Sequence, residues 1–467
     1  MSYNVVGRSV PRIDGLNKVL GRACFIDDME FPNMLYAKLL RSKHAHARIL
    51  KVDTSRAEAT RGVRGVLTSR DVPVNFHCIS FKDQPLLASD KVRYLGDPVA
   101  CVAAESEDVA EEALALIDVQ YEPLPAVFDA HEAMKPDAPR VHDRPNLYFH
   151  RKIRFGDVEK GFEESDSTFE DEFSTQRIEQ CHIEPHGAIG SVDASGRVTV
   201  WTPAQSLPLV HSQLARVLGL PTSAVRILQT TLGGGFGGKT DLSVEPYVAL
   251  LAMKTRRPVK MTWTREEEFT GSTIRHNYVM KYKTGVKRDG TIVAREVELI
   301  ADTGAYTSYG DVQLTKASIF ARGPYNIPNV KVDAYLVASN NLVAGAMRGF
   351  GVVQVTAAEE THTDNIAERL EIDPLELRLK NALKTGDQLA TGQILHSVGL
   401  VETLVKAGQT SGWGLSAPSA TDPRKRRGRG LACFQYPIGF TAQPNPSGAF
   451  LKVNNDGTVN VIPGARE

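Results

Sequence analysis

The sequence G-G-G-F-G-G-K at residues 233–239 carries five glycines around a single phenylalanine. Glycine loses more conformational entropy on folding than any other residue, so a turn this rich in glycine makes sense where backbone N–H groups must approach another group closely. The pattern around the turn predicts a strand at 224–230 and a helix at 244–254. We therefore expect a ligand-binding turn between a strand and a helix.

The same turn with its following residue satisfies G-x-x-x-x-G-K-[ST], the phosphate-binding motif of nucleotide triphosphatases. In such a protein Lys239 would neutralise phosphate charge and Thr240 would hold magnesium. The upstream pattern favours antiparallel hairpins over a parallel βαβ series, and no hydrophobic strand ends in a convincing magnesium-binding aspartate. A P-loop nucleotide-binding protein is therefore a remote alternative, as is a tight turn without a ligand.

Composition and charge exclude several classes of function. The 467 residues contain 55 Lys and Arg against 55 Asp and Glu, and a zero net charge argues against a general nucleic-acid or membrane-surface role. No stretch reaches about 18 apolar residues and the N-terminus lacks the apolar region of a signal peptide, so we expect a cytoplasmic protein without a membrane span. The five cysteines form no C-x-x-C pair, so iron–sulfur clusters would have to lie on another chain.

Hydrophobic periodicity and turn residues favour an α+β fold. Residues 130–160, rich in Pro, Asp and His, are interpreted as a connector, and the Arg-rich stretch 418–430 as an exposed linker rather than a nucleic-acid patch. The expected strands are 34–40, 49–52, 117–121 and 198–201, the expected helices are 106–117, 207–218, 356–370 and a short one from 373, and the expected hairpins are 281–299 and 449–462.

Several motifs, in order along the whole chain, resemble the xanthine dehydrogenase/aldehyde oxidoreductase family of molybdenum hydroxylases. T-L-G-G-G-F-G-G-K at 231–239 and A-G-A-M-R-G-F-G at 344–351 are similar to its paired signature. K-V-R-Y-L-G-D-P-V-A at 91–100 resembles its hammerhead domain. G-P-Y-N-I-P-N-V at 323–330 and A-T-G-Q-I-L-H-S-V-G-L-V-E-T-L at 390–404 look especially like the nicotinate dehydrogenase branch, in its large molybdopterin subunit.

This resemblance implies a domain order. Residues 1–130 would form the hammerhead α/β domain, 131–160 a connector and 161–412 the first molybdopterin-binding domain. Residues 413–467 would begin the second such domain, which a partner chain would complete.

The resemblance also implies the chemistry. Family members bind a molybdopterin dinucleotide, here expected in its cytosine form, in which the pterin dithiolene holds molybdenum without a direct protein ligand. The expected reaction is hydroxylation of an electron-poor carbon in an aromatic N-heterocycle, nicotinate- or purine-like, with water as the oxygen source. Electrons would pass to a 2Fe-2S subunit and an FAD subunit. A 4-hydroxybenzoyl-CoA reductase-like enzyme, an aldehyde-oxidising member and a metal-free scaffold subunit are the alternatives.

Cofactor contacts are implied at the first glycine turn. Gln205 lies 31 residues before Phe236, the family's spacing for a glutamine whose amide contacts a molybdenum oxygen. Phe236 stands where the family uses a backbone N–H as donor to that centre, and Gly235 and Gly237 would let the backbone come close. Without the resemblance, Gln205 would be taken for an ordinary surface residue.

The second turn is expected to face the first. Ala346 and Arg348 match cofactor-side positions, and Arg348 corresponds to the family's arginine next to the metal, with a plain salt bridge as its alternative. Phe350 matches the ring that stacks beside an aromatic substrate, with a core position as its alternative.

Three further positions bear on the substrate. Thr240 replaces the glutamate with which xanthine enzymes bind purine, which makes xanthine a less favoured substrate. Lys316 replaces the family's substrate-contacting arginine nine residues before Tyr325, so the positive charge remains but bidentate geometry is lost. Phe440, in P-I-G-F-T at 437–441, resembles a second aromatic clamp. A planar, anionic heterocycle follows as the expected substrate.

The family's general base, a glutamate in a later G-E motif, has no counterpart in this sequence. In the family a G-Q-G motif also follows a G-x-x-E like that at 464–467. The resemblance therefore implies a split active site completed by a second molybdopterin subunit, with a truncated gene product as the other explanation. H-I-E-P-H at 182–186 would place three ligand-type side chains on one strand face, but in the family this segment is structural, and we expect no metal there.

Overall fold

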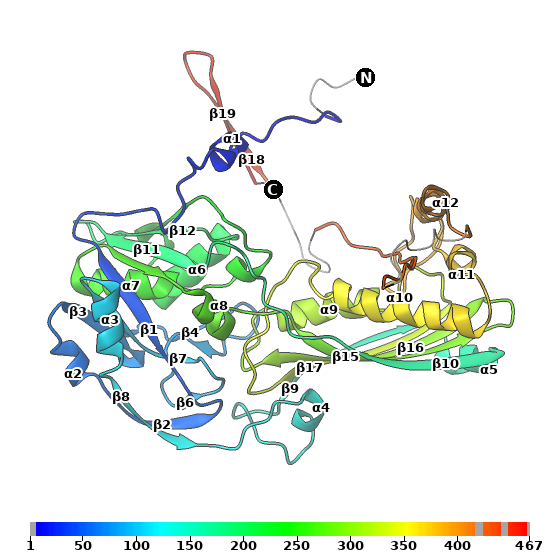
Figure 1. The fold of residues 1–467 in the computed structure, drawn as a ribbon, viewed down its shortest axis with the longest axis horizontal. Helices are drawn as coiled ribbons and strands as arrows, with labels where there is room; N and C mark the ends of the chain where they lie inside the picture. Colours follow the sequence, from blue (N-terminus) through cyan, green and yellow to red (C-terminus); the bar gives the residue numbers. More distant parts are fainter. Residues whose placement is uncertain (1–5, 416–423, 440–446, 465–467) are drawn as a thin grey trace.

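The computed structural model describes residues 6–415, 424–439 and 447–464. Two large sheets organise these residues into two lobes, and helices pack on both (Figure 1). Helices and strands are mixed along the chain and antiparallel strand pairs predominate, so the expected α+β class is confirmed.

The first lobe is built on a seven-stranded sheet that joins two distant parts of the sequence. Its strand order is β13-β12-β11-β14-β1-β7-β3. Leu35 of β1 lies opposite Val259 of β14, so the N-terminal strands extend the later ones, and a single hydrophobic core spans the junction. The strands are β1 (Leu35–Arg41), β3 (Val63–Thr68), β7 (Pro98–Ala104), β11 (Gly187–Val192), β12 (Val198–Thr202), β13 (Val225–Gln229) and β14 (Val259–Thr262).

Three helices expected from the sequence pack on this sheet. α3 (Glu107–Leu114) begins where the Ser106 hydroxyl accepts a hydrogen bond from the backbone of Val109. α6 (Leu207–Val217) and α7 (Glu245–Thr255) flank the glycine turn in sequence and contact the strands beside it. The other elements of this lobe are β2 (Ala47–Asp53), α2 (Ser55–Glu58), β4 (Phe76–His77), β5 (Gln84–Pro85), β6 (Lys91–Val92), β8 (Asp118–Pro123) and α8 (Arg265–Gly271). The short helix α1 (Gly15–Val19) buries no residue and lies apart from the sheet (Figure 1).

The second lobe is built on a five-stranded sheet of order β10-β15-β16-β17-β9. The expected hairpin is its centre, formed by β15 (Asn277–Val286) and β16 (Ile292–Gly304). α9 (Gly310–Phe320) and α10 (Val352–Arg369) lie across one face, where they bury residues such as Tyr278, Leu299 and Val355 (Figure 1). The remaining strands are β9 (Leu147–Phe155), β10 (Ser167–Ser174) and β17 (Asn329–Ala338).

Two expectations need correction. The stretch 131–160 contains regular structure: α4 (Ala130–Ala133), the start of α5 (Val158–Glu163) and β9, an edge strand that pairs with β17. Its mostly half-exposed, charged pattern hid this strand, because its register depends on a partner far along the chain. α10 begins at Val352 rather than near 356, since the β-branched run that opens it favours a strand by local propensity.

Beyond α10 lie α11 (Pro374–Asn381), capped by the Asp373 side chain as expected, and α12 (Leu400–Ser411). The expected hairpin is formed by β18 (Ala449–Val453) and β19 (Val459–Pro463), whose residues are all exposed, and it stands apart from both sheets (Figure 1). Residues 424–430 of the Arg-rich stretch are exposed, and the rest lies outside the described residues. In the part of the chain that the structure describes, no helix combines the length and apolarity needed to cross a membrane.

Candidate functional site

Gln205 holds the first glycine turn in shape. Its side-chain Oε1 accepts hydrogen bonds from the N–H groups of Gly237 (2.8 Å) and Lys239 (3.3 Å), and its backbone N–H donates to the Lys239 carbonyl at 2.7 Å. A Cβ atom at Gly235 would lie only 2.5 Å from Oε1, so a side chain there would displace the glutamine. The sequence therefore needs glycine at this point because the glutamine amide approaches the backbone.

The second turn locks against the first. The N–H of Arg348 donates to the Phe236 carbonyl at 2.9 Å, and a Cβ at Gly237 would lie 2.6 Å from the Ala346 carbonyl oxygen. Phe236 and Phe350 both adopt left-handed backbone conformations, with φ of 51° and 42°. Such strained non-glycine residues cost about 1–3 kcal/mol each and gather at functional sites.

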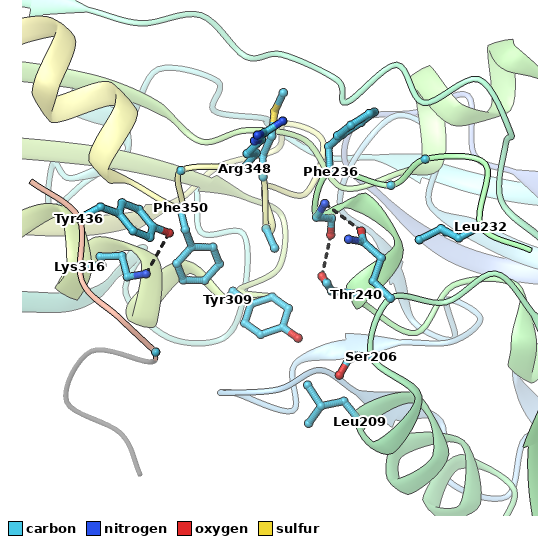
Figure 2. A pocket seen from close by; sticks show the side chains of 18 of the residues that line it. Ser206, Leu209, Leu232, Phe236, Thr240, Tyr309, Lys316, Arg348, Phe350 and Tyr436 are labelled. Carbon is cyan, nitrogen blue, oxygen red and sulfur yellow. Dashed lines mark hydrogen bonds between the residues drawn. The ribbon is translucent and has the colours of Figure 1, made fainter. Parts of the chain in front are cut away.

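A pocket of about 930 Å³ opens between the two turns. Lys316 and Tyr436 lie at one end and Thr240 and Leu232 at the other (Figure 2). Its wall brings together nine of the ten predicted site residues: Thr240, Gln205, Gly235, Phe236, Gly237, Lys316, Ala346, Arg348 and Phe350. The tenth, Phe440, lies outside the described residues.

The electrostatic character of the pocket is positive. The described residues that line it include Arg348 and Lys316, with Arg12 and Lys18 at the rim beside Asp14, and none of these lining residues is acidic. Within the described ranges, the Arg348 guanidinium forms no ion pair, which argues against its alternative as a plain salt-bridge residue.

Unused backbone donors add to this character. The N–H groups of Gly235 and Phe236 have no protein acceptor among the described residues. Free N–H donors beside an unpaired guanidinium suit a ligand rich in anionic oxygen atoms. The donor set therefore fits a cofactor that carries oxo and phosphate groups.

Lys316 of α9 is the charged end of the pocket. Its side chain is almost fully buried, at 7% exposed. The ammonium donates a hydrogen bond to the Tyr436 hydroxyl at 3.2 Å and lies 4.5 Å from the Tyr436 ring centre and 5.5 Å from that of Phe350. No carboxylate of the described residues pairs with it. A buried cation with a hydroxyl and two aromatic rings beside it, but no carboxylate among the described residues, favours an anion supplied by a ligand.

The geometry argues against a phosphate loop. Lys239 is buried at 2% exposed, and its ammonium pairs with Glu184 at 2.8 Å instead of facing the loop cavity. The Thr240 hydroxyl donates to the Gly237 carbonyl at 2.6 Å. Only a three-residue 3₁₀ turn, Gly238–Thr240, follows directly, and α7 begins at Glu245, so the α-helix N-terminus that phosphate binding would require does not adjoin the turn.

Two aromatic residues of the pocket were not predicted. Tyr309 packs edge-on against Phe350, with ring centres 5.8 Å apart, and Tyr436 contacts Lys316 (Figure 2). Tyr436 immediately precedes the predicted clamp segment at 437–441, which was the available signal. Tyr309 carries no local signal, because only the packing of the loop before α9 against the second turn brings it to the pocket.

Two family models match the sequence. Residues 20–125 match the a/b hammerhead domain of aldehyde oxidase and xanthine dehydrogenase, and residues 141–382 match the molybdopterin cofactor-binding domain. Both glycine turns and Lys316 lie within the second match.

Comparisons with individual proteins agree with these models. The nicotinate dehydrogenase large molybdopterin subunit of Eubacterium barkeri is 44% identical over 407 residues, which cover 87% of this chain and 96% of that subunit. A probable xanthine dehydrogenase subunit of Bacillus subtilis is 38% identical over 98% of this chain, which spans 61% of its length.

Solved structures extend the comparison to three dimensions. Aldehyde oxidoreductase from Desulfovibrio gigas superimposes with a TM-score of 0.86 at 29% identity, over 97% of this chain and 51% of that one. Quinoline 2-oxidoreductase from Pseudomonas putida 86 gives a TM-score of 0.81 at 30% identity, over 87% of this chain and 54% of that one.

Proposed function

The chain belongs to the aldehyde oxidase and xanthine dehydrogenase family of molybdenum oxidoreductases, and from that premise we propose that it is the molybdopterin-binding subunit of a multi-subunit hydroxylase for an anionic aromatic N-heterocycle. The observation that carries the proposal is the buried Lys316, which faces two aromatic rings and lacks a protein counter-ion among the described residues. Lys316 lies at the end of a pocket lined by both glycine turns, so a ligand bound in that pocket would contact its ammonium group.

The cofactor would be held by the two turns. Gln205, the free N–H of Phe236 and the Arg348 guanidinium would contact its oxygen atoms, while Gly235, Gly237 and Ala346 keep the backbone close enough for those contacts. We propose the cytosine dinucleotide form. When bound, this cofactor would supply the two-electron oxidation and the use of water as oxygen source. The protein's own part is to bind and orient the substrate.

The substrate would lie flat between the aromatic rings and point its charge at Lys316. Phe350 and Tyr309 offer edge and face contacts worth about 0.5–1.5 kcal/mol each. The Lys316 ammonium and the Tyr436 hydroxyl would both bind a carboxylate or enolate-like oxygen, and Thr240 leaves no purine-binding acid at the other end. A nicotinate-like acid fits this arrangement better than an aldehyde, because an uncharged aldehyde cannot form an ion pair with Lys316.

Partner subunits would complete the enzyme. No acidic residue lines the pocket among the described residues, so we propose that a second molybdopterin subunit supplies the general base. The five cysteines are free and scattered, which supports a separate 2Fe-2S subunit, and we propose an FAD subunit from the family relationship alone. The exposed hairpin β18–β19 supports a contact with such a partner, because an isolated two-stranded ribbon is only marginally stable in water.

A substrate panel tests the proposal. The purified complex is assayed with an artificial electron acceptor against nicotinate, nicotinamide, purines, benzoyl-CoA analogues and aromatic aldehydes. We expect the highest kcat/KM for the anionic pyridine acid and a much lower value for its neutral amide. Preference for an aldehyde or a CoA thioester would contradict the proposed substrate class, and no turnover of any member would support the scaffold alternative.

A further inference from the structure

A second cluster of ligand-type side chains lies behind the glycine turn, outside the pocket. His182 and His186 flank a bend before β11, and Glu268 comes from α8. All three are buried, and one ligand atom of each lies within 4.8 Å of the others. The third member of the H-I-E-P-H motif, Glu184, is not part of this cluster because it pairs with Lys239.

The hydrogen bonds of His182 fix which of its nitrogens is free. Nδ1 lies 2.7 Å from the Glu184 carbonyl oxygen, which can only accept, so Nδ1 carries the proton. Nε2 therefore presents a lone pair, has no hydrogen-bond partner among the described residues, and lies 3.8 Å from a Glu268 carboxylate oxygen.

His186 uses its two ring nitrogens the other way round. Its Nε2 lies 3.2 Å from the Gly238 carbonyl oxygen and so donates to it, while Nδ1 lies 2.9 Å from both carboxylate oxygens of Glu268. The His186 backbone N–H also donates to a Glu268 carboxylate oxygen, so both the ring and the backbone of His186 contact this carboxylate. Two imidazole nitrogens and a carboxylate thus converge, which requires a proton or a metal cation between them.

A fourth electron-pair donor lies at the same place. The Gln180 amide donates through Nε2 to the Ala346 carbonyl at 2.8 Å, which leaves Oε1 buried and without a partner among the described residues. A Cβ at Gly238 would lie 3.3 Å from the His182 Nε2 and 3.4 Å from the Gln180 Oε1. A proton on His186 would satisfy Glu268 alone and would leave both of these buried acceptors without a donor.

Against the expectation from the sequence that H-I-E-P-H binds no metal, we propose that His182, His186 and Glu268 bind a divalent zinc-type ion, with the Gln180 amide oxygen or a water as its fourth ligand. Two histidines and one glutamate are a ligand set that zinc prefers, at about 2.0–2.2 Å from each atom. Both histidines also donate their second ring N–H to a backbone carbonyl, which is the usual support of a metal-bound imidazole.

The ion would have a structural role for the neighbouring pocket. It would tie α8 and the segment before β11 to the rear of the glycine turn, since His186 holds the Gly238 carbonyl and Gln180 holds the Ala346 carbonyl. None of the three ligands lines the pocket itself. The proposal therefore adds a second metal to the chain without changing where the substrate binds.

Metal analysis of the purified complex tests this proposal. Elemental mass spectrometry should find about one zinc per chain, counted separately from molybdenum. The zinc content per chain of the His182→Gln variant should be at least about tenfold lower than that of the wild type. His362→Gln is the matched control, because His362 is also fully buried but its ring nitrogens contact Asp171 and Thr284, and it should keep its zinc. Absence of zinc in the wild type, or retention in His182→Gln, would overturn the proposal.

A second measurement covers the case in which the variant does not fold. The wild-type complex is treated with a zinc chelator and its thermal midpoint is recorded, then again after addition of Zn²⁺ or Mg²⁺. We expect a lower midpoint that Zn²⁺ restores and Mg²⁺ does not, with a nitrogen and oxygen shell at about 2.0–2.1 Å in X-ray absorption at the zinc edge. An unchanged midpoint and no such shell would contradict the site. Neither readout depends on molybdenum or on turnover, so this proposal can fail while the proposed function stands.

Discussion

Phe236 and Phe350 are the centres of two turns that hold each other in a strained conformation. Each has a positive φ, and each is followed by a glycine that also has one, Gly237 and Gly351. The strained conformation persists because Gln205 accepts hydrogen bonds from the first turn and the Arg348 N–H joins the second turn to the first. The positions of the two phenylalanines could be predicted from the motifs, but their backbone strain follows only from the contact between the turns.

Replacing Gly237 by alanine should abolish the site while leaving the fold. The added Cβ would lie 2.6 Å from the Ala346 carbonyl oxygen, in addition to the cost of a residue at φ +106°. Gly196→Ala is the matched control, since Gly196 also has a positive φ of +85° but no atom within 4 Å of its Cβ position. Both variants should lose about 1–2 kcal/mol of stability from the backbone term.

Only Gly237→Ala should lose bound molybdenum, and the measurement is the molybdenum content per chain of each purified complex. Equal retention by the two variants would show that contact between the turns is not needed to hold the cofactor.

Replacing Lys316 by methionine should remove the preference for an anionic substrate. The side chain keeps its length, but a substrate carboxylate would lose its buried partner, a change that costs about 2–5 kcal/mol. We expect at least about a 30-fold lower kcat/KM for the acid and little change for its neutral amide. Lys316→Arg keeps the charge and should retain most of the preference. A parallel loss for acid and amide would indicate a packing role instead.

Among the elements, those with strong local signals could be predicted and those that depend on distant partners could not. α6, α7 and the β15–β16 hairpin follow from periodicity, caps and turn residues. β9 and the start of α10 did not, because an edge strand of mixed polarity and a β-branched helix start resemble other structures locally. Glu268 and Tyr436 reach their partners 82 and 120 residues away, and no local pattern could reveal such contacts.

The β18–β19 hairpin has one wholly apolar face. Cross-strand pairs place Leu451, Val453, Val459 and Val461 on that face, whereas the opposite face carries the polar pair Lys452 and Asn460 beside the apolar pair Phe450 and Ile462. These apolar side chains are 50–72% exposed. We therefore expect the face of the four aliphatic residues to contact the partner subunit.

The double variant Leu451→Ser with Val461→Ser should weaken assembly by about 3 kcal/mol of lost apolar burial, or about a hundredfold in the dissociation constant. Lys452→Ser with Asn460→Ser is the control on the other face and should assemble normally. Analytical ultracentrifugation of the complexes measures both. Equal effects of the two pairs would rule out a face-specific contact.

At the scale of the whole molecule, the two parts of the chain that match different family models share one sheet and one core. β1 and β14 are neighbouring strands, and Leu35 lies in the same cluster as Leu214 and Val248. The proposed boundary near residue 130 therefore divides the sequence but does not separate two independent cores. The α+β class and the order of the motifs could be predicted because the family signatures are local, whereas this merging of sheets depends on a strand pair 224 residues apart.

Asp97 joins the two lobes and should give the molecule a measurable pH dependence. It is fully buried and accepts hydrogen bonds from the Arg93 N–H and the Tyr306 hydroxyl, and burial raises its pKa to about 6. Because the folded state then holds a proton more tightly than the unfolded state, stability falls as the pH rises from about 4 to about 6.

Asp97→Asn should gain up to about 3 kcal/mol relative to the wild type across that window. Denaturant unfolding at pH 4, 5, 6 and 7 checks this. Asp193→Asn is the control, and its effect on stability should have the opposite sign. Hydrogen bonds from Ser195 and from the Arg197 backbone lower the pKa of the exposed Asp193 carboxyl, so the charged form stabilises the folded state. A difference between Asp97→Asn and the wild type that does not change with pH would contradict the account of Asp97.

The central claim is that the two glycine turns form one wall of a molybdopterin site, and the content of molybdenum and pterin in the purified complex tests it most directly. Elemental analysis and fluorescence of the oxidised pterin should each give about one equivalent per chain, with no bound nucleotide triphosphate. A preparation free of molybdenum and pterin that instead retains ATP would contradict the claim and would assign the turn at residues 233–240 to phosphate binding.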